Sequence, residues 1–207
     1  DRAIAAGEIT ADEAQEWTRV AVAALSTGVE EGSEAGSDHS TAEPTLATPV
    51  DAFDHCAIVF EAAGVEEWRS RNGLPPGVDT LNPTWSPTAP NGPTLSCGQN
   101  GVLYIVIDAT DEATAERILS ESQALDALFP DVESSAALDG ATGSSSYLSS
   151  GTSILASVDL RRDLRLVYVQ LTVSDSQVDE STANQILLSI AGVAFDLELP
   201  PPDSTWD

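Results

Sequence analysis

Lysine and methionine are absent from this chain of 207 residues, and only eight of its residues are basic. Those eight are arginines, set against 34 aspartates and glutamates, which gives a formal net charge of −26. A negative field of this size repels nucleic acids and anionic membrane surfaces, so we expect neither as a partner. It favours cationic or calcium-bearing partners, and we expect either a protein or a cell-wall component.

Long hydrophobic runs are also missing, so we expect no helix that crosses a membrane. Hydrophobic residues nevertheless make up 42% of the chain, which is enough to fill a core and too much for a disordered protein. The chain does not begin with methionine, so we expect that an N-terminal segment, with any anchor it carried, has been removed.

Motifs for catalysis or for binding a cofactor do not stand out. No CxxC pair, nucleophile elbow or regular DxDxDG calcium loop occurs. The two histidines offer no credible catalytic base, since His39 lies in a polar stretch and His55 is adjacent to a cysteine. We therefore expect no enzymatic activity and no cofactor. A weak calcium cluster of Asp131, Glu133 and Asp139 leaves a calcium-supported hydrolase as an alternative.

The N-terminal 30 residues carry the signals of a helical hairpin. Thr10 and Glu13 form a capping box, whose side chains satisfy backbone N–H groups at the start of a helix. Apolar residues follow at helical spacing. The segment resembles short bacterial helical hairpins of the form x-G-x-[IL]-T-x-[ED]-E, which implies a contact between subunits through Trp17, Val20 and Leu25. The alternative is an amphipathic helix that docks on the main domain.

Residues 31–49 predict a flexible acidic linker, residues 50–199 an α+β domain, and residues 200–207 a tail. In the domain we expect a helix over 51–63, a hairpin through Asn100-Gly101 into a strand over 102–108, and a helix capped by Thr110. A second hairpin joins strands over 153–159 and 164–173, followed by a helix over 178–191 and a strand over 193–199.

Two stretches of the domain are expected to be irregular, namely the proline-rich segment that ends at Pro93 and the polar segment 131–146. The two hairpins then predict an antiparallel sheet with the helices packed on one face.

The two cysteines, Cys56 and Cys97, lie in the first helix and the first strand of this domain. Zinc needs four ligands at characteristic spacings, and His55 and Cys56 leave a helix in different directions. We therefore predict a disulfide, which closes a loop of about 40 residues and stabilises the fold by roughly 4 kcal/mol. Such a bridge places the protein in an oxidising compartment outside the cytoplasm. Free thiols in a cytoplasm of high salt, which would also explain the acidity, are the alternative.

The stretches DAFDHC and LSC, followed by strand, helix, hairpin and helix, resemble small exported envelope domains of actinobacteria over about residues 50–199. This group includes lipoproteins and the extracytoplasmic sensor domain of some receptor kinases. The resemblance implies a non-enzymatic role at the cell envelope. The sensor domains usually carry two disulfides, whereas this chain has cysteines for one.

Two groups of residues are candidates for binding a ligand or partner. Tryptophan and arginine are typical of recognition surfaces, and the first group combines them in and before the proline-rich segment: Trp68, Arg69, Arg71 and Trp85. The second group is suited to an anionic partner and lies at a hairpin tip: Arg161, Arg162 and Arg165. The alternatives are that the tryptophans cap the core, and that the arginines of the tip pair with neighbouring aspartates.

These features together predict a non-enzymatic extracytoplasmic module, secreted or anchored, that binds or assembles at a bacterial cell envelope. The alternative is a structural or accessory subunit of a larger surface or membrane complex, assembled through residues 1–30.

Overall fold

The computed structural model describes residues 51–74, 81–126, 138–150, 153–174 and 178–202. The predicted hairpin over 1–30, with Trp17, Val20 and Leu25, lies outside these residues. So do the linker over 31–49 and two members of the calcium candidate, Asp131 and Glu133.

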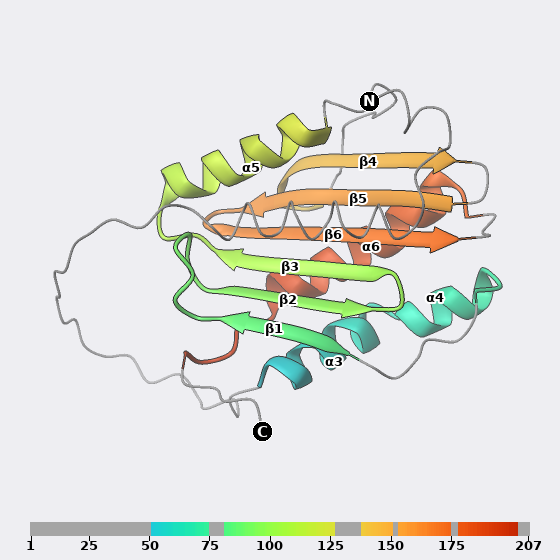
Figure 1. Cartoon of the computed structure of the whole chain (residues 1–207), viewed down its shortest axis with the longest axis horizontal. Coiled ribbons are helices and arrows are strands. Elements are labelled where there is room, and N and C mark those ends of the chain that lie inside the picture. Colours follow the sequence, from blue (N-terminus) through green and yellow to red (C-terminus); the bar gives the residue numbers. More distant parts are fainter. Residues whose placement is uncertain (1–50, 75–80, 127–137, 151–152, 175–177, 203–207) are drawn as a thin grey trace, which may run out of the picture.

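Six strands form one antiparallel sheet in the order β1-β2-β3-β6-β5-β4 (Figure 1). Their bounds are β1 Asn82–Ser86, β2 Thr94–Gln99, β3 Val102–Asp108, β4 Thr142–Ser150, β5 Ser153–Arg162 and β6 Arg165–Ser174. Four helices are described with it: α3 Ala52–Ala62, α4 Val65–Arg71, α5 Glu112–Asp126 and α6 Glu180–Asp196. The predicted α+β class with an antiparallel sheet is therefore confirmed.

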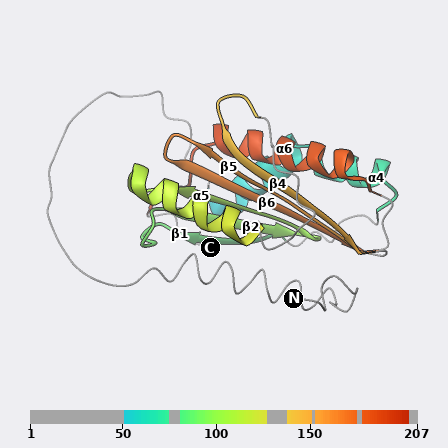
Figure 2. The same ribbon diagram turned by 90° about the horizontal axis from the view of Figure 1, so that it is seen from above.

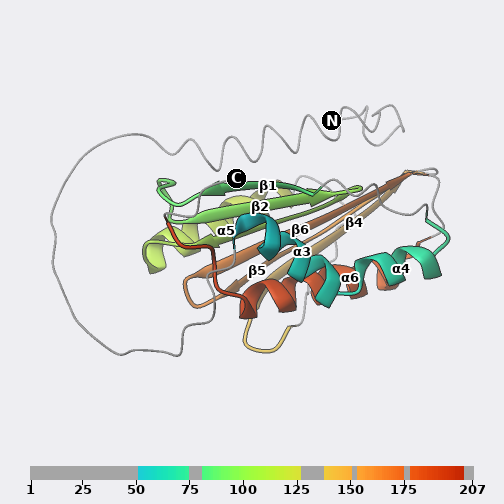
Figure 3. The same ribbon diagram turned by 90° about the horizontal axis from the view of Figure 1, so that it is seen from below.

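The helices cover both faces of the sheet, so the prediction that they share one face is wrong. α3, α4 and α6 lie on one face, and α5 lies on the other, where it contacts β4, β5 and β6 (Figures 2 and 3). The reason is visible in β3, where Tyr104 and Val106 enter the core under α6 while Ile105 and Ile107 enter the core under α5. A strand that is apolar on both sides needs cover on both sides.

Both predicted hairpins form. Asn100 and Gly101 have φ angles of 52° and 81°, the left-handed pair that a two-residue hairpin turn requires, and β2 pairs with β3 across it. At the second tip Arg162 pairs with Arg165, and Asp163 has a φ of 54°. These tight turns set the register of the two central hairpins.

Two further strands arise where irregular structure was expected. β1 forms within the proline-rich segment and contains Pro83, which an edge strand tolerates because one of its sides needs no partner. β4 forms from a serine-rich stretch with little β propensity, because its whole length pairs with β5. In both cases a neighbouring strand supplied the stabilisation that the local sequence lacked.

Two helices also differ from expectation. The short helix α4 follows Gly64, whose φ of 70° ends α3 and turns the chain. α6 continues to Asp196, where a strand was expected, because Ala194 and Phe195 remain on its buried side. The cap of α5 is Asp111 and not Thr110, since the Asp111 carboxylate accepts a hydrogen bond from the Thr114 N–H at 2.8 Å.

Candidate functional site

The centre of the described structure is a buried disulfide between the helical layer and the sheet. Cys56 of α3 and Cys97 of β2 form this bridge, as predicted, with their Cα atoms 5.7 Å apart. Both residues are 0% exposed. The bridge therefore fastens α3 to the sheet from inside the core, where solutes do not reach it.

Next to the bridge lies a buried polar pair. His55 Nδ1 and the Tyr104 hydroxyl are 3.0 Å apart, and both side chains are 0% exposed. Tyr104 stands opposite Cys97 in the β2–β3 register, so the pair and the disulfide are neighbours. Phe60 covers the Tyr104 ring edge-on, with ring centroids 5.4 Å apart. His55 Nε2 contacts no hydrogen-bond partner among the described residues.

Burial controls the charge of this pair. Loss of hydration, with a smaller contribution from the positive charge of Arg165, lowers the pKa of His55 to about 4. Burial likewise raises the pKa of Tyr104 above its usual range. Both side chains are therefore neutral at neutral pH. A catalytic acid or base must reach its substrate, and this enclosed pair does not.

The three arginines of the β5–β6 tip are held by internal acceptors. Arg165 makes a bidentate ion pair with Asp108, at 2.6 and 2.7 Å, and its Nη1 donates to the carbonyls of Phe195 and Leu197 at the end of α6. These bonds satisfy carbonyls that a helix end leaves without partners. Arg165 therefore joins β3, β6 and α6.

The other two arginines of the tip reach opposite faces of the sheet. Arg161 pairs with Glu112 at the start of α5. Arg162 pairs with Asp196 at the end of α6, at 2.8 Å, and lies over the Phe195 ring at 4.6 Å from its centroid. These partners favour a structural role for the group over docking of an external anion.

The tryptophans of the first candidate group belong to the core. Trp68 and Trp85 are each 7% exposed, and their indole N–H groups donate to the carbonyls of Thr182 and Pro201. Pro201 belongs to the C-terminal stretch predicted as a tail, so the described part of that stretch packs on the domain. Each indole fastens a distant segment of the chain to the helical side of the sheet.

The two arginines of this group, Arg69 and Arg71, differ in burial and in their partners. Arg69 is 6% exposed and donates from Nη1 to the Asn100 carbonyl at 2.8 Å, which ties α4 to the β2–β3 turn. Arg71 is exposed and pairs with Glu67, one helical turn away on the same helix. The four residues thus form no common aromatic and basic surface.

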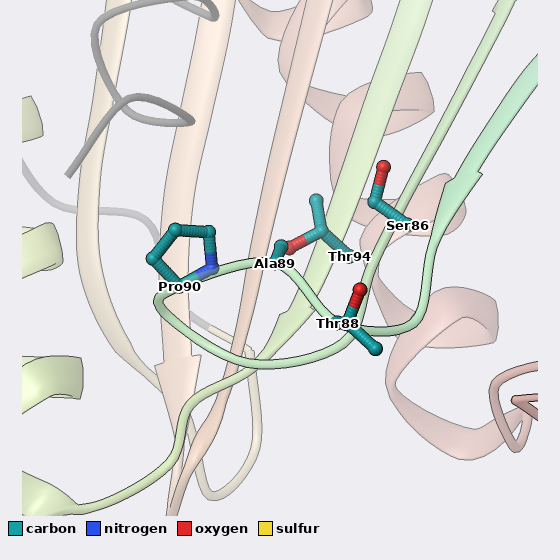
Figure 4. Close-up of a pocket in the computed structure, with 5 residues that line it drawn as sticks. All are labelled: Ser86, Thr88, Ala89, Pro90 and Thr94. Atoms are coloured by element: carbon teal, nitrogen blue, oxygen red, sulfur yellow. The ribbon is translucent and has the colours of Figure 1, made fainter. Parts of the chain in front are cut away.

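A shallow pocket of about 260 Å³ lies at the β1–β2 turn (Figure 4). It is lined by Ser86, Thr88, Ala89, Pro90 and Thr94. Sites for small molecules are usually larger, about 300–1,000 Å³, and combine apolar walls with convergent polar groups. The lining of this pocket contains three hydroxyl side chains and no charged or aromatic one.

The described residues contain no cluster of three or more His, Cys, Asp or Glu side chains that could hold a metal ion. Asp139, the described member of the calcium candidate, is exposed, and its backbone carbonyl accepts from Arg162 at 3.1 Å. Within the same part of the chain, no helix is long and apolar enough to cross a membrane.

No family model matches this sequence, and no curated protein is similar to it.

Two partners were not predicted from the sequence, namely Tyr104 as the partner of His55 and Asp108 as the partner of Arg165. A partner for Asp108 could have been predicted from the sequence, because a carboxylate at the end of an otherwise apolar strand is favoured by a polar partner.

Proposed function

We propose that this chain is a non-enzymatic extracytoplasmic module that binds or assembles at a bacterial cell envelope. The observation that carries the proposal is the fully buried Cys56–Cys97 bridge, which joins α3 to the sheet. Structural disulfides persist in oxidising compartments and are rare in the cytoplasm of mesophiles.

The arrangement of polar side chains supports binding over catalysis. Within the described residues, the buried histidine faces a tyrosine, and the tip arginines face carboxylates and carbonyls of the same chain. An enzyme places such groups where a substrate meets them. Here they contact partners of the same chain instead, which supports a structural role for them.

The redox state of the natural protein tests the compartment. Protein purified from its source without reductant is unfolded in denaturant together with an alkylating reagent, so that the reagent reaches both cysteines, and is then weighed intact. We expect a mass two hydrogens below that of the dithiol chain, with no alkylation. Two alkylated cysteines in native material would overturn the extracytoplasmic assignment and favour a cytoplasm of high salt.

Binding and turnover test the activity. We expect the full chain to co-sediment with isolated cell envelopes and to turn over no member of a panel of esters, peptides and glycans. Turnover that chelation abolishes would instead establish the calcium-supported hydrolase. Envelope binding that requires other proteins would favour the alternative of a subunit within a larger surface or membrane complex.

A further inference from the structure

We propose that the Asn100-Gly101 turn is a site of spontaneous deamidation, in which the Gly101 nitrogen attacks the side chain of Asn100 and Arg69 favours the attack. The inference is independent of the proposed function, since it concerns a chemical change within the chain. The turn joins β2 to β3 and lies next to α4 (Figure 1). Gly101 is exposed, so water and hydroxide reach the turn.

The reaction is a ring closure followed by hydrolysis. A hydroxide ion removes the proton of the Gly101 N–H, and the nitrogen forms a bond to Cγ of Asn100. The bond between Cγ and Nδ2 breaks, and Nδ2 takes a proton from water and leaves as ammonia. Water then opens the resulting succinimide at either carbonyl. The product is aspartate or isoaspartate, so the chain gains one carboxylate and, in the isoaspartate, one backbone atom.

The fold requires glycine at position 101. Gly101 has a φ of 81°, and a Cβ there would lie 2.2 Å from the Thr172 carbonyl oxygen. Because glycine has no side chain, nothing on this residue hinders the approach of its own nitrogen to Cγ of Asn100. The same constraint that shapes the hairpin therefore keeps an unhindered nitrogen beside Asn100.

The chain has three Asn-Gly pairs, at positions 72–73, 91–92 and 100–101. The Gly73 N–H donates to the Ser70 carbonyl at 3.2 Å, and the Gly92 N–H donates to the Ala89 carbonyl at 2.9 Å. The Gly101 N–H, by contrast, donates to no residue in the described part of the chain. A nitrogen held in a hydrogen bond must lose that bond before it attacks, so the third pair has the lowest barrier of this kind.

The side chains of the other two asparagines are also restrained. Asn72 donates from Nδ2 to the Trp68 carbonyl at 2.8 Å. Asn91 is 9% exposed, and its Oδ1 accepts from Arg117 at 2.7 Å. The two pairs therefore serve as controls within the same molecule.

Arg69 activates the peptide nitrogen of the turn. Its Nη1 donates at 2.8 Å to the Asn100 carbonyl, which belongs to the same peptide unit as the Gly101 nitrogen. When that nitrogen loses its proton, negative charge develops on this oxygen, where a guanidinium stabilises it. Arg69 is 6% exposed, so water screens its charge little. The Asn100 side chain then reaches the nitrogen through a local rotation at the hairpin tip, without separation of the strands.

Peptide mapping of the folded full chain during incubation tests the proposal. We expect Asn100 to deamidate at least about tenfold faster than Asn72 and Asn91, because both of these must first give up hydrogen bonds. In the reduced chain unfolded in denaturant, the three rates should be similar. Equal rates in the folded protein would overturn the proposal. The same ranking in the unfolded chain would assign the preference to local sequence and would also overturn it.

The products identify the route. Attack by the Gly101 nitrogen yields isoaspartate together with aspartate, and its rate rises with the concentration of hydroxide. Direct hydrolysis of the Asn100 side chain by water yields aspartate alone. We expect isoaspartate at position 100, detected with an isoaspartate-specific methyltransferase, and a faster reaction at alkaline than at neutral pH. Aspartate alone would contradict attack by the peptide nitrogen.

Two matched variants test Arg69. Arg69→Lys keeps a positive charge beside the Asn100 carbonyl, whereas Arg69→Gln keeps a donor without the charge. We expect Arg69→Gln to slow the change at Asn100 about tenfold, Arg69→Lys to slow it less, and neither to affect Asn91. Thermal unfolding verifies that both variants fold. Equal rates in the wild type and both variants would overturn the role of Arg69, and the ranking of the three pairs in the wild type tests the site without any substitution.

Discussion

The two faces of the sheet are buried to different extents and by different means. The face under α3, α4 and α6 contains the larger core, with the disulfide, both described tryptophans and Tyr104. The face under α5 has a smaller apolar cluster around Ile105, Ile107 and Ile118, and α5 also buries the polar Asp159. From this difference we expect the first face to supply most of the stability, whereas α5 completes the cover of β3 and β6.

Removal of the disulfide from the larger core is expected to cause the largest loss of stability. The variant with Cys56→Ala and Cys97→Ala should lose about 4 kcal/mol of unfolding free energy, because the unfolded chain regains the freedom of a loop of about 40 residues. Urea unfolding of the wild type, the reduced wild type and the double variant measures the loss. Equal stabilities of wild type and variant would show that the bridge adds nothing to the larger core.

Truncation of one side chain on each face compares the two cores directly. Leu187 of α6 is 0% exposed, whereas Leu119 of α5 is only partly buried. We expect Leu187→Ala to cost about 3 kcal/mol and Leu119→Ala about 1 kcal/mol, since the first leaves a closed cavity and the second a site that solvent reaches. Denaturant midpoints with unchanged slopes provide the measurement. A larger loss at Leu119 would reverse the ranking of the two faces.

Acid should weaken the larger core through His55. Its pKa is about 4 in the folded protein and 6.5 without the fold, so the unfolded chain binds more protons between these values. The contribution of neutral His55 is complete above about pH 6.5 and falls with pH until about pH 4, by roughly 2–3 kcal/mol.

The variant His55→Gln isolates this effect from the titration of the many carboxylates. Its amide replaces the imidazole beside the Tyr104 hydroxyl without a titratable group. The difference in unfolding free energy between wild type and variant should therefore change between pH 7 and pH 4, in the direction of a relatively weaker wild type at acid pH. A difference that is constant with pH would contradict a buried neutral histidine.

The smallest effects concern two arginines, Arg165 at the β5–β6 tip and Arg71 on α4. Arg165→Ala removes a bidentate pair and two bonds to the end of α6, so we expect a loss of about 2 kcal/mol. Arg71→Ala removes an exposed pair within one helix and should cost less than about 0.5 kcal/mol. Thermal unfolding of both variants measures the contrast. Equal losses would mean that Arg165 is no more than a surface ion pair.

Local patterns predicted the central part of the fold well. The alternation of apolar residues in β3 and β6, the Asn100-Gly101 turn and the Cys56–Cys97 pair are all confirmed, since each depends on the strand period, on turn chemistry or on two residues that are rare in the chain. The candidate site was less predictable. Arg165 stood out as a charge, but its partners Asp108 and Leu197 lie far away in the sequence.

The amino-acid sequence by itself determined the strand faces, the tight turns, the cysteine bridge and the acidic surface, because these follow from residue type and short spacing. Only the tertiary structure decided that α5 covers the second face and that β1 and β4 join the sheet. It also decided that Trp68 and Trp85 lie in the core and that Arg161, Arg162 and Arg165 pair with acceptors of the same chain. The physical reason is that burial and hydrogen bonding depend on contacts between segments that are distant in the chain. A local sequence pattern does not predict which distant segments will be partners.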